Sequence, residues 1–154
     1  MSNPRSTLQI AGHPIHVMIV PFVIAFYVGA FVTDLAYAGT GDPFWARGAI
    51  WLLAAGVVMS VLAALAGITD FLAEPQIRSL SASWWHFGGN ALVAVISIAD
   101  LYLRYVAGYQ SGSEQYLWMS GLVVALLIFT GWKGWEMVYK DHVGVSETTL
   151  HPAE

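Results

Sequence analysis

Residues 48–69, GAIWLLAAGVVMSVLAALAGIT, form an uncharged run that consists almost entirely of apolar and small side chains. About 20 such residues are enough for a helix to cross the hydrocarbon core of a bilayer. Three other stretches of the chain have a similar character, so we predict four membrane-spanning helices. Their expected limits are residues 14–37, 44–71, 84–106 and 115–139. Transmembrane β-strands are not expected, because these runs do not alternate between apolar and polar residues.

The composition also indicates a membrane protein. The 154 residues are 57% hydrophobic and only 10% charged, whereas about a quarter of the residues in soluble domains are charged. A soluble chain of this length could not cover its surface with so few charges. A net charge of -4 with six Lys and Arg gives no basic surface for nucleic acid. The absence of cysteine excludes disulfides and thiolate metal sites.

The links between the spans are short. Residues 38–43 (AGTGDP) have the composition of a turn, residues 107–114 are rich in Gly and Ser, and residues 72–83 form the longest link. Short links favour antiparallel neighbours, so the predicted fold is all-α: one domain forming an up-down-up-down four-helix bundle in the membrane. Five small residues are expected to let the helices approach closely: Gly56, Ala63, Gly67, Gly121 and Ala125. We detect no internal repeat, and residues 143–154 are expected to form a flexible polar tail.

Charged residues predict the orientation of the bundle and two ion pairs. Four basic residues are expected at the face that holds both termini: Arg5, Arg78, Lys133 and Lys140. The opposite face has Arg47 and Arg104, so the positive-inside rule places the termini in the cytoplasm. Within the third span, Asp100 and Arg104 are four residues apart and can pair on one helical face. Lys133, Glu136 and Lys140 are predicted to form a similar ion-pair stripe near the end of the fourth span.

Four of the five histidines are expected at one membrane face. His13 and His16 open the first span. His86 lies at the start of the third span and His142 follows the fourth, whereas His151 belongs to the polar tail. Imidazole is the commonest metal ligand in proteins and a common axial ligand of haem iron. The cluster therefore favours a cofactor site, although single histidines at helix ends also occupy the lipid headgroup region without further function.

The sequence resembles the DUF2231 family, a bacterial family of small four-helix membrane proteins. The resemblance is carried by residues 12–16 (GHPIH), residues 66–70 (AGITD), His86 with Asn90, and residues 142–145 (HVGV). Some relatives resemble fusions to Rieske-type domains. The overall plan also resembles small b-type cytochromes, whose bundles hold haem between histidines of neighbouring helices. The resemblance implies a multi-pass protein of the bacterial inner membrane with a role in electron transfer.

The first functional hypothesis is a haem b-binding electron-transfer module. His16 and His86 are the expected axial ligands, because both lie at helix starts and can face the interior of the bundle. His13 and His142 are expected to contact the haem propionates or the ligating histidines, and Asn90 shares a helical face with His86. The protein would position the haem and set its potential. Its partner would be quinone or a soluble redox protein, for example one of the Rieske type.

The second hypothesis is a non-haem site for a divalent metal ion such as zinc, copper or iron. Its candidate ligands are His13, His16, His86, His142, Asp70 and Glu136. An open coordination position would make the protein a metal-dependent enzyme. Asp70 has two further interpretations, as a carboxylate that orients a ligating imidazole or as a partner of Arg78.

The third hypothesis is a structural or assembly subunit without a cofactor, which could form a homo-oligomer in the bilayer. The positions of the histidines distinguish this hypothesis from the two cofactor hypotheses. Both of those require His86 and His142 to lie at the same face as His16, within about 15 Å of it.

Overall fold

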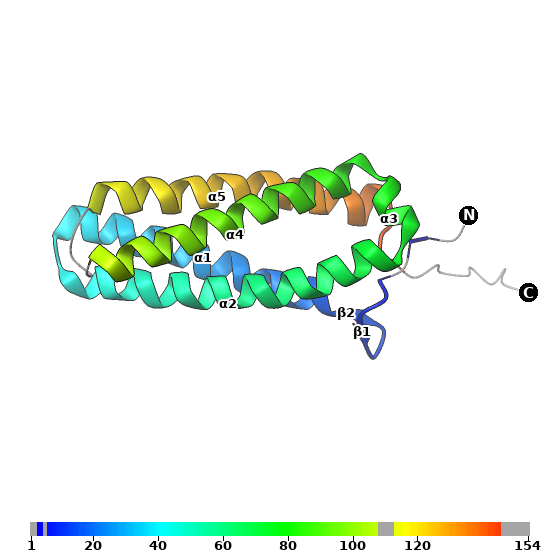
Figure 1. Ribbon diagram of the computed structural model, residues 1–154, viewed down its shortest axis with the longest axis horizontal. Coiled ribbons are helices and arrows are strands. Elements are labelled where there is room, and N and C mark those ends of the chain that lie inside the picture. Colours follow the sequence, from blue (N-terminus) through cyan, green and yellow to red (C-terminus); the bar gives the residue numbers. More distant parts are fainter. Residues whose placement is uncertain (1–2, 5, 108–112, 146–154) are drawn as a thin grey trace, which may run out of the picture.

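Four long helices lie side by side in the computed structural model, which describes residues 3–4, 6–107 and 113–145 (Figure 1). They are α1 (Ile15–Thr40), α2 (Pro43–Ala73), α4 (Ser81–Ala107) and α5 (Ser113–Trp135). A π-helical turn, η1 (Glu136–Lys140), continues α5, and the short helix α3 (Pro75–Ser79) links α2 to α4. The predicted all-α four-helix bundle is confirmed.

Each long helix can cross a membrane. The four candidate spans contain 26, 31, 27 and 27 residues and are strongly apolar. A helix of this length extends for roughly 40 Å, which exceeds the ~30 Å hydrocarbon core of a bilayer. Large apolar side chains also cover the outside of the bundle, among them Trp51, Val95 and Ile128. Because lipid can cover such a surface and water cannot, the chain is a membrane protein.

Local sequence signals fix the predicted turn between α1 and α2. Gly41 ends α1 with a left-handed backbone (φ 68°), and its N–H donates to the Tyr37 carbonyl at 2.8 Å. The carboxylate of Asp42 then accepts from the Phe44 N–H at 2.9 Å and caps α2, whose first residue is Pro43. Both helices therefore extend a few residues beyond the limits expected from hydropathy.

A short β-hairpin precedes α1 and corrects the expected start of the first span. Strand β1 (Gln9–Ile10) pairs with the antiparallel strand β2 (His13–Pro14). Ala11 and Gly12 form the turn, and both have positive φ, which tight two-residue hairpins favour. His13 thus lies on a strand and not on the helix.

The order of the helices around the bundle places α1 and α4 on a diagonal. Helix α1 packs against α2 and α5, and α4 packs against the same two neighbours. In Figure 1, α4 runs obliquely, widely separated from α2 near α3 and closer to it at the opposite end. The first and last described residues (3–4 and 143–145), the β-hairpin and α3 all lie at one end of the bundle (Figure 1). We call this the histidine end.

The buried positions of the first two long helices recur in the last two. Those of α1 and α4 are separated by seventy residues: Val23 and Val93, Tyr27 and Ser97, Ala30 and Asp100, Asp34 and Arg104. Those of α2 and α5 are separated by sixty-seven residues: Ala49 and Tyr116, Leu53 and Ser120, Gly56 and Val123, Ala63 and Thr130. The helix pair α1–α2 is therefore equivalent to the helix pair α4–α5, and an approximate twofold axis along the bundle relates the two pairs.

This structural repeat corrects the expectation that the chain has none. Most of these equivalent positions carry different side chains, for example Tyr27 in α1 and Ser97 in α4, or Asp34 in α1 and Arg104 in α4. The repeat therefore lies in the burial pattern, which becomes visible only once the helices are packed.

Most of the small residues expected at helix contacts are found there. A Cβ atom at Gly56 would lie 2.6 Å from the ring of Tyr27, and one at Gly121 would lie 3.3 Å from Phe31. Gly67 makes a similar contact with a histidine, described below, and Ala63 is buried. Ala125 is exposed, so that part of the prediction is wrong.

Part of the expected flexible tail is held in place. The Gly144 N–H donates to the Pro4 carbonyl at 2.8 Å, and the Asn3 side chain donates to the Val145 carbonyl at 3.1 Å. The two ends of the chain thus meet at the histidine end. Residues 146–154, which include His151, lie outside the described residues.

Candidate functional site

His16 and His86 face each other across the core at the histidine end. His16 lies in the first turn of α1 and His86 in the second turn of α4. Their ring centroids are 6.0 Å apart and their planes are inclined at 81°. Because α1 and α4 are diagonal neighbours, this contact spans the interior of the bundle. The distance meets the requirement that the cofactor hypotheses place on His86.

Both imidazoles are oriented by a backbone carbonyl of the adjacent helix. The Nδ1 atom of His16 lies 2.8 Å from the Ala63 carbonyl on α2, and that of His86 lies 2.8 Å from the Thr130 carbonyl on α5. A carbonyl oxygen can only accept, so Nδ1 carries the hydrogen in both rings. The neutral ring then keeps a lone pair on Nε2. Metal-ligating histidines commonly donate their other ring N–H to a backbone carbonyl in this way.

A glycine supports each ring one helical turn beyond its carbonyl partner. A Cβ atom at Gly67 on α2 would lie 3.0 Å from the Nδ1 atom of His16. A Cβ atom at Gly134 on α5 would lie 3.0 Å from the Cε1 atom of His86. The two halves of the bundle therefore hold their histidines by the same device, a carbonyl acceptor and a glycine four residues later.

The surroundings of His86 combine open space with close packing. Gly88 is exposed, and a Cβ atom there would have no atom within 4 Å, so it faces the outside of the bundle. Gly89 has a different role, because a Cβ atom there would lie 2.3 Å from the Thr130 side chain, so it is a packing position between α4 and α5. On the α2 side, Phe71 stacks on Phe87 with ring centroids 5.1 Å apart.

The other two histidines of the predicted cluster lie at the same end but at the surface. His13 is exposed, and its Nδ1 atom lies 3.0 Å from the Ala11 carbonyl within the hairpin. His142 is exposed and has a positive φ of 54°. The segment that follows it packs beside the hairpin, since a Cβ atom at Gly144 would lie 3.5 Å from Pro14. The structure thus brings His16 and His86 into contact and leaves His13 and His142 at the rim.

Asp70 has a different role from those expected. Its carboxylate accepts from the Ser6 hydroxyl at 2.7 Å, and from the N–H and hydroxyl of Thr7 at 2.7 and 2.8 Å. It also accepts from the Leu8 N–H at 3.1 Å. Arg78 instead donates to the carbonyls of Phe71 and Leu72. Asp70 therefore anchors the N-terminal segment, and it neither orients an imidazole nor pairs with Arg78. Nothing in the sequence indicated that residues 6–8 would fold back against the end of α2.

The remaining candidates have local partners. Glu136 accepts from Lys133 at 2.8 Å, which confirms that predicted ion pair. The Asn90 amide donates to the His86 carbonyl at 2.8 Å, one turn earlier on α4. Across residues 3–4, 6–107 and 113–145, no group of three or more His, Asp or Glu side chains is arranged to hold a metal ion.

A second polar site lies at the opposite end of the bundle. Arg104 donates to Asp100 on the same helix at 2.9 Å, as predicted, and to both oxygens of Asp34 on α1 at 2.7 Å. The guanidinium also lies 4.7 Å from the centre of the Tyr116 ring on α5. All three charged side chains are buried. The sequence analysis missed Asp34, although its position in the first span matches that of Arg104 in the third.

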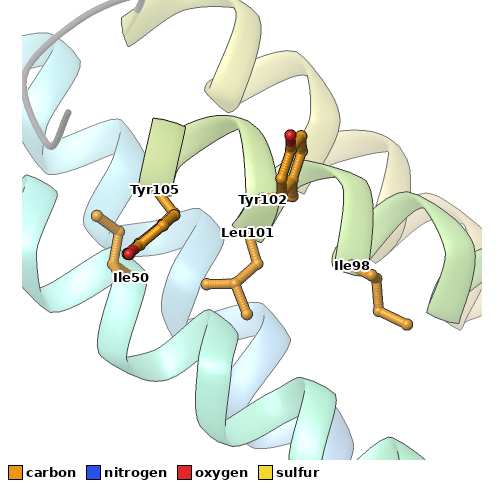
Figure 2. Close-up of a pocket in the computed structure, with 5 residues that line it drawn as sticks. All are labelled: Ile50, Ile98, Leu101, Tyr102 and Tyr105. Carbon is orange, nitrogen blue, oxygen red and sulfur yellow. The ribbon is translucent and has the colours of Figure 1, made fainter. Parts of the chain in front are cut away.

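A shallow apolar groove of about 400 Å³ lies on the outer surface between α2 and α4, towards this second end (Figure 2). It is lined by Ile50 of α2 and by Ile98, Leu101, Tyr102 and Tyr105, which share one face of α4. The groove contains no charged side chain, as expected for a surface in contact with lipid.

Four apolar helices, with charged side chains confined to the core and to the two ends, define an integral membrane four-helix bundle. The chain belongs to the DUF2231 family of predicted membrane proteins, whose family model matches residues 12–147. No curated protein and no solved structure matches the chain.

Proposed function

We propose that the protein is a haem b-binding electron-transfer module of the bacterial inner membrane, with His16 and His86 as the two axial ligands. The observation that carries this proposal is the matched pair of imidazoles. Each donates Nδ1–H to a backbone carbonyl and keeps its Nε2 lone pair for a metal. Two such rings from diagonal helices are what a four-helix bundle offers to a metal held in its core.

The spacing of the rings supports a shared iron. Two imidazole nitrogens that bind one metal ion from opposite sides lie about 4 Å apart, because each metal–nitrogen distance is about 2 Å. A ring centroid lies roughly 1 Å behind its nitrogen, so the centroids are expected about 6 Å apart. The centroids of His16 and His86 are 6.0 Å apart. This centroid distance matches the one expected for two imidazoles that bind the same metal ion.

Bound haem would supply reversible one-electron transfer. The protein's contribution is to fix the ligands and exclude water from them. The carbonyls of Ala63 and Thr130 orient the rings and raise the basicity of their ligating nitrogens. Gly67 and Gly134 let the rings seat against the helices. His13 and His142, exposed at the rim, are suited to contact the haem propionates. The Asn90 side chain donates to the His86 carbonyl and so stabilises the turn of α4 that carries His86.

The position of the site suggests the class of redox partner. The histidines lie at one end of helices that cross the membrane, so electrons can be exchanged with a soluble protein at that face, such as one of the Rieske type, or with quinone in the bilayer. The metal-site alternative receives less support. Asp70 and Glu136 already have other partners, which leaves two imidazoles as the core ligands.

The proposal is tested by the haem and metal content of protein purified from cells supplied with haem. We expect about one haem b per chain in the wild type and a loss of most of it in His16→Ala and His86→Ala. His13→Ala and His142→Ala serve as controls and should keep their haem. A folded wild type without haem would refute the proposal. Stoichiometric zinc, copper or iron in that sample would favour the metal site, and the absence of any cofactor would favour a structural subunit.

A further inference from the structure

The cluster of Asp34, Asp100 and Arg104 has an unbalanced charge. The two carboxylates each accept two hydrogen bonds from a single guanidinium, at 2.7 to 3.0 Å. The exposed fractions of the Asp34 and Asp100 side chains are 5% and 0%, and that of Arg104 is 4%. If both carboxyls were ionised, the buried cluster would carry one net negative charge. Such a charge is strongly unfavourable where neither water nor a counter-ion compensates it.

No other charge at this end can compensate the cluster. Asp42, Arg47 and Glu114 are the remaining charged residues there, and all three side chains are exposed. Helix α2 presents apolar side chains to the core at this level, including Ala49 and Leu53, and the sequence between α4 and α5 adds no charge. The neighbouring titratable group on α5 is Tyr116, whose hydroxyl donates to the Leu103 carbonyl at 3.3 Å.

The cluster lies within the depth of the membrane. Asp34 is six residues before the end of α1, and Asp100 is seven before the end of α4, which puts both about 10 Å inside the helix ends. Asp34 is also eighteen residues beyond His16, a separation of about 27 Å along the helix. The histidines and the charge cluster therefore lie near opposite ends of the bundle.

A buried hydroxyl lies one helical turn from the cluster. Ser97 is fully buried, and its Oγ atom makes no well-formed hydrogen bond among the described residues. It precedes Asp100 by one turn, and Ser97, Asp100 and Arg104 share one buried face of α4. It also interacts with the Tyr27 hydroxyl on α1, which accepts from Ser60 at 3.0 Å. Polar side chains therefore continue along the core from the carboxyls towards the middle of the bundle.

We propose that Asp34, Asp100 and Arg104 form a proton-binding site, which holds one proton on a carboxyl at neutral pH and exchanges it with the membrane face opposite the histidines. Binding converts one carboxylate to a carboxylic acid and brings the cluster to zero net charge. Val23, Val93 and Leu127, buried between the cluster and the histidines, close the path in the other direction. A sodium ion is a competing occupant, because each carboxylate oxygen accepts one hydrogen bond from Arg104 and keeps a second lone pair.

Infrared spectroscopy of the haem-free protein in lipid tests the proposal independently of the haem site. The wild type at pH 7 should show a carboxylic-acid C=O band that shifts in D2O. Either Asp34→Asn or Asp100→Asn should abolish this band, because one carboxylate then balances Arg104. Arg104→Gln should about double it. Asp42→Asn, at an exposed carboxylate of the same end, is the control and should leave it unchanged.

Three results would overturn the proposal. One is a wild-type spectrum without the band at pH 7, which needs no variant. Another is a band that persists in both Asn variants. The third is a wild-type band that appears only when sodium is removed, which would identify a cation as the normal occupant. Circular dichroism of each variant checks that it has folded.

Discussion

Asp34 and Arg104 form a bidentate ion pair, and each lies eighteen residues beyond the histidine of its own helix. They are equivalent positions of the two halves, as His16 and His86 are. In a bundle built from two identical helix pairs, each residue near the twofold axis would face its own copy. Two aspartates or two arginines at this position would repel each other. In this single chain the two positions carry opposite charges and bind each other, while the histidine positions have stayed alike.

This relationship gives the bundle two ends of different character. At one end, the equivalent residues His16 and His86 are identical, and their imidazole rings are 6.0 Å apart. At the other, equivalent residues are complementary and hold a buried charge cluster. The predictions below test the two ends separately.

Alanine at Gly67 or Gly134 should displace the histidine that rests on it. A Cβ atom at either position would lie 3.0 Å from an imidazole atom. Overpacking of this kind costs about 1–3 kcal/mol, so we expect a lower melting temperature and a clear loss of haem in both variants. Gly88→Ala and Gly131→Ala are the matched controls, because a Cβ atom at either site would have no atom within 4 Å. Equal haem occupancy in all four variants would contradict the described ring contacts.

Removing Arg104 should destabilise the bundle more than removing another arginine. Arg104→Ala leaves two carboxyls facing each other in the core, and breaking a buried ion pair costs about 3–5 kcal/mol. Arg47→Ala removes an exposed side chain and should change stability by less than about 0.5 kcal/mol. Reversible unfolding in mixed detergent measures both. A small effect of Arg104→Ala would show that the cluster contributes little to folding.

Asp70→Ala should release the N-terminal segment from the histidine end. The carboxylate accepts four hydrogen bonds from Ser6, Thr7 and Leu8, and hydrogen bonds to charged groups contribute about 1.5–3 kcal/mol each. Amide exchange of residues 6–14 should therefore accelerate at least tenfold, while the cores of the long helices stay protected. Glu136→Gln, at a surface ion pair, is the control. Unchanged exchange in Asp70→Ala would mean that other contacts hold the segment.

The orientation predicted by the basic residues can be read from single cysteines, because the chain has none of its own. Arg104 is buried in the cluster and no longer counts as a loop charge, which leaves Arg47 at that face and strengthens the charge bias. In intact bacterial cells, Thr40→Cys at the exposed C-terminal end of α1 should react with a membrane-impermeant thiol reagent. Ser79→Cys in α3 should react only after permeabilisation. The reverse pattern would place the termini outside.

Hydropathy was sufficient to predict the four spans, because membrane-crossing length and lack of charge are properties of a continuous segment. The meeting of four histidines at one end followed from antiparallel topology alone. To predict the contact between His16 and His86, one must also know that α1 and α4 lie diagonally across the bundle. The lengths of the links do not determine that arrangement.

The failures share a cause, since each depends on chain segments that meet only after folding. Asp70 is bound by residues 6–8, which precede the first span by sequence and return to the second in space. Asp34 binds Arg104, for which the i,i+4 spacing on α4 had already predicted Asp100 as the partner. His13 was expected at the helix start, but positive φ angles at Ala11 and Gly12 turn the chain into a hairpin. The structural repeat was missed because burial is repeated at many positions and residue identity at only a few, such as His16 and His86.

The absorption spectrum of the haem-loaded protein, oxidised and then reduced with dithionite, tests the central claim most directly. With His16 and His86 as axial ligands, the wild type should give a Soret band and sharp α and β bands on reduction. His16→Ala and His86→Ala should each lose the low-spin spectrum, whereas His13→Ala and His142→Ala should retain it. A wild type without these bands, or one whose spectrum survives the loss of both core histidines, would contradict the account.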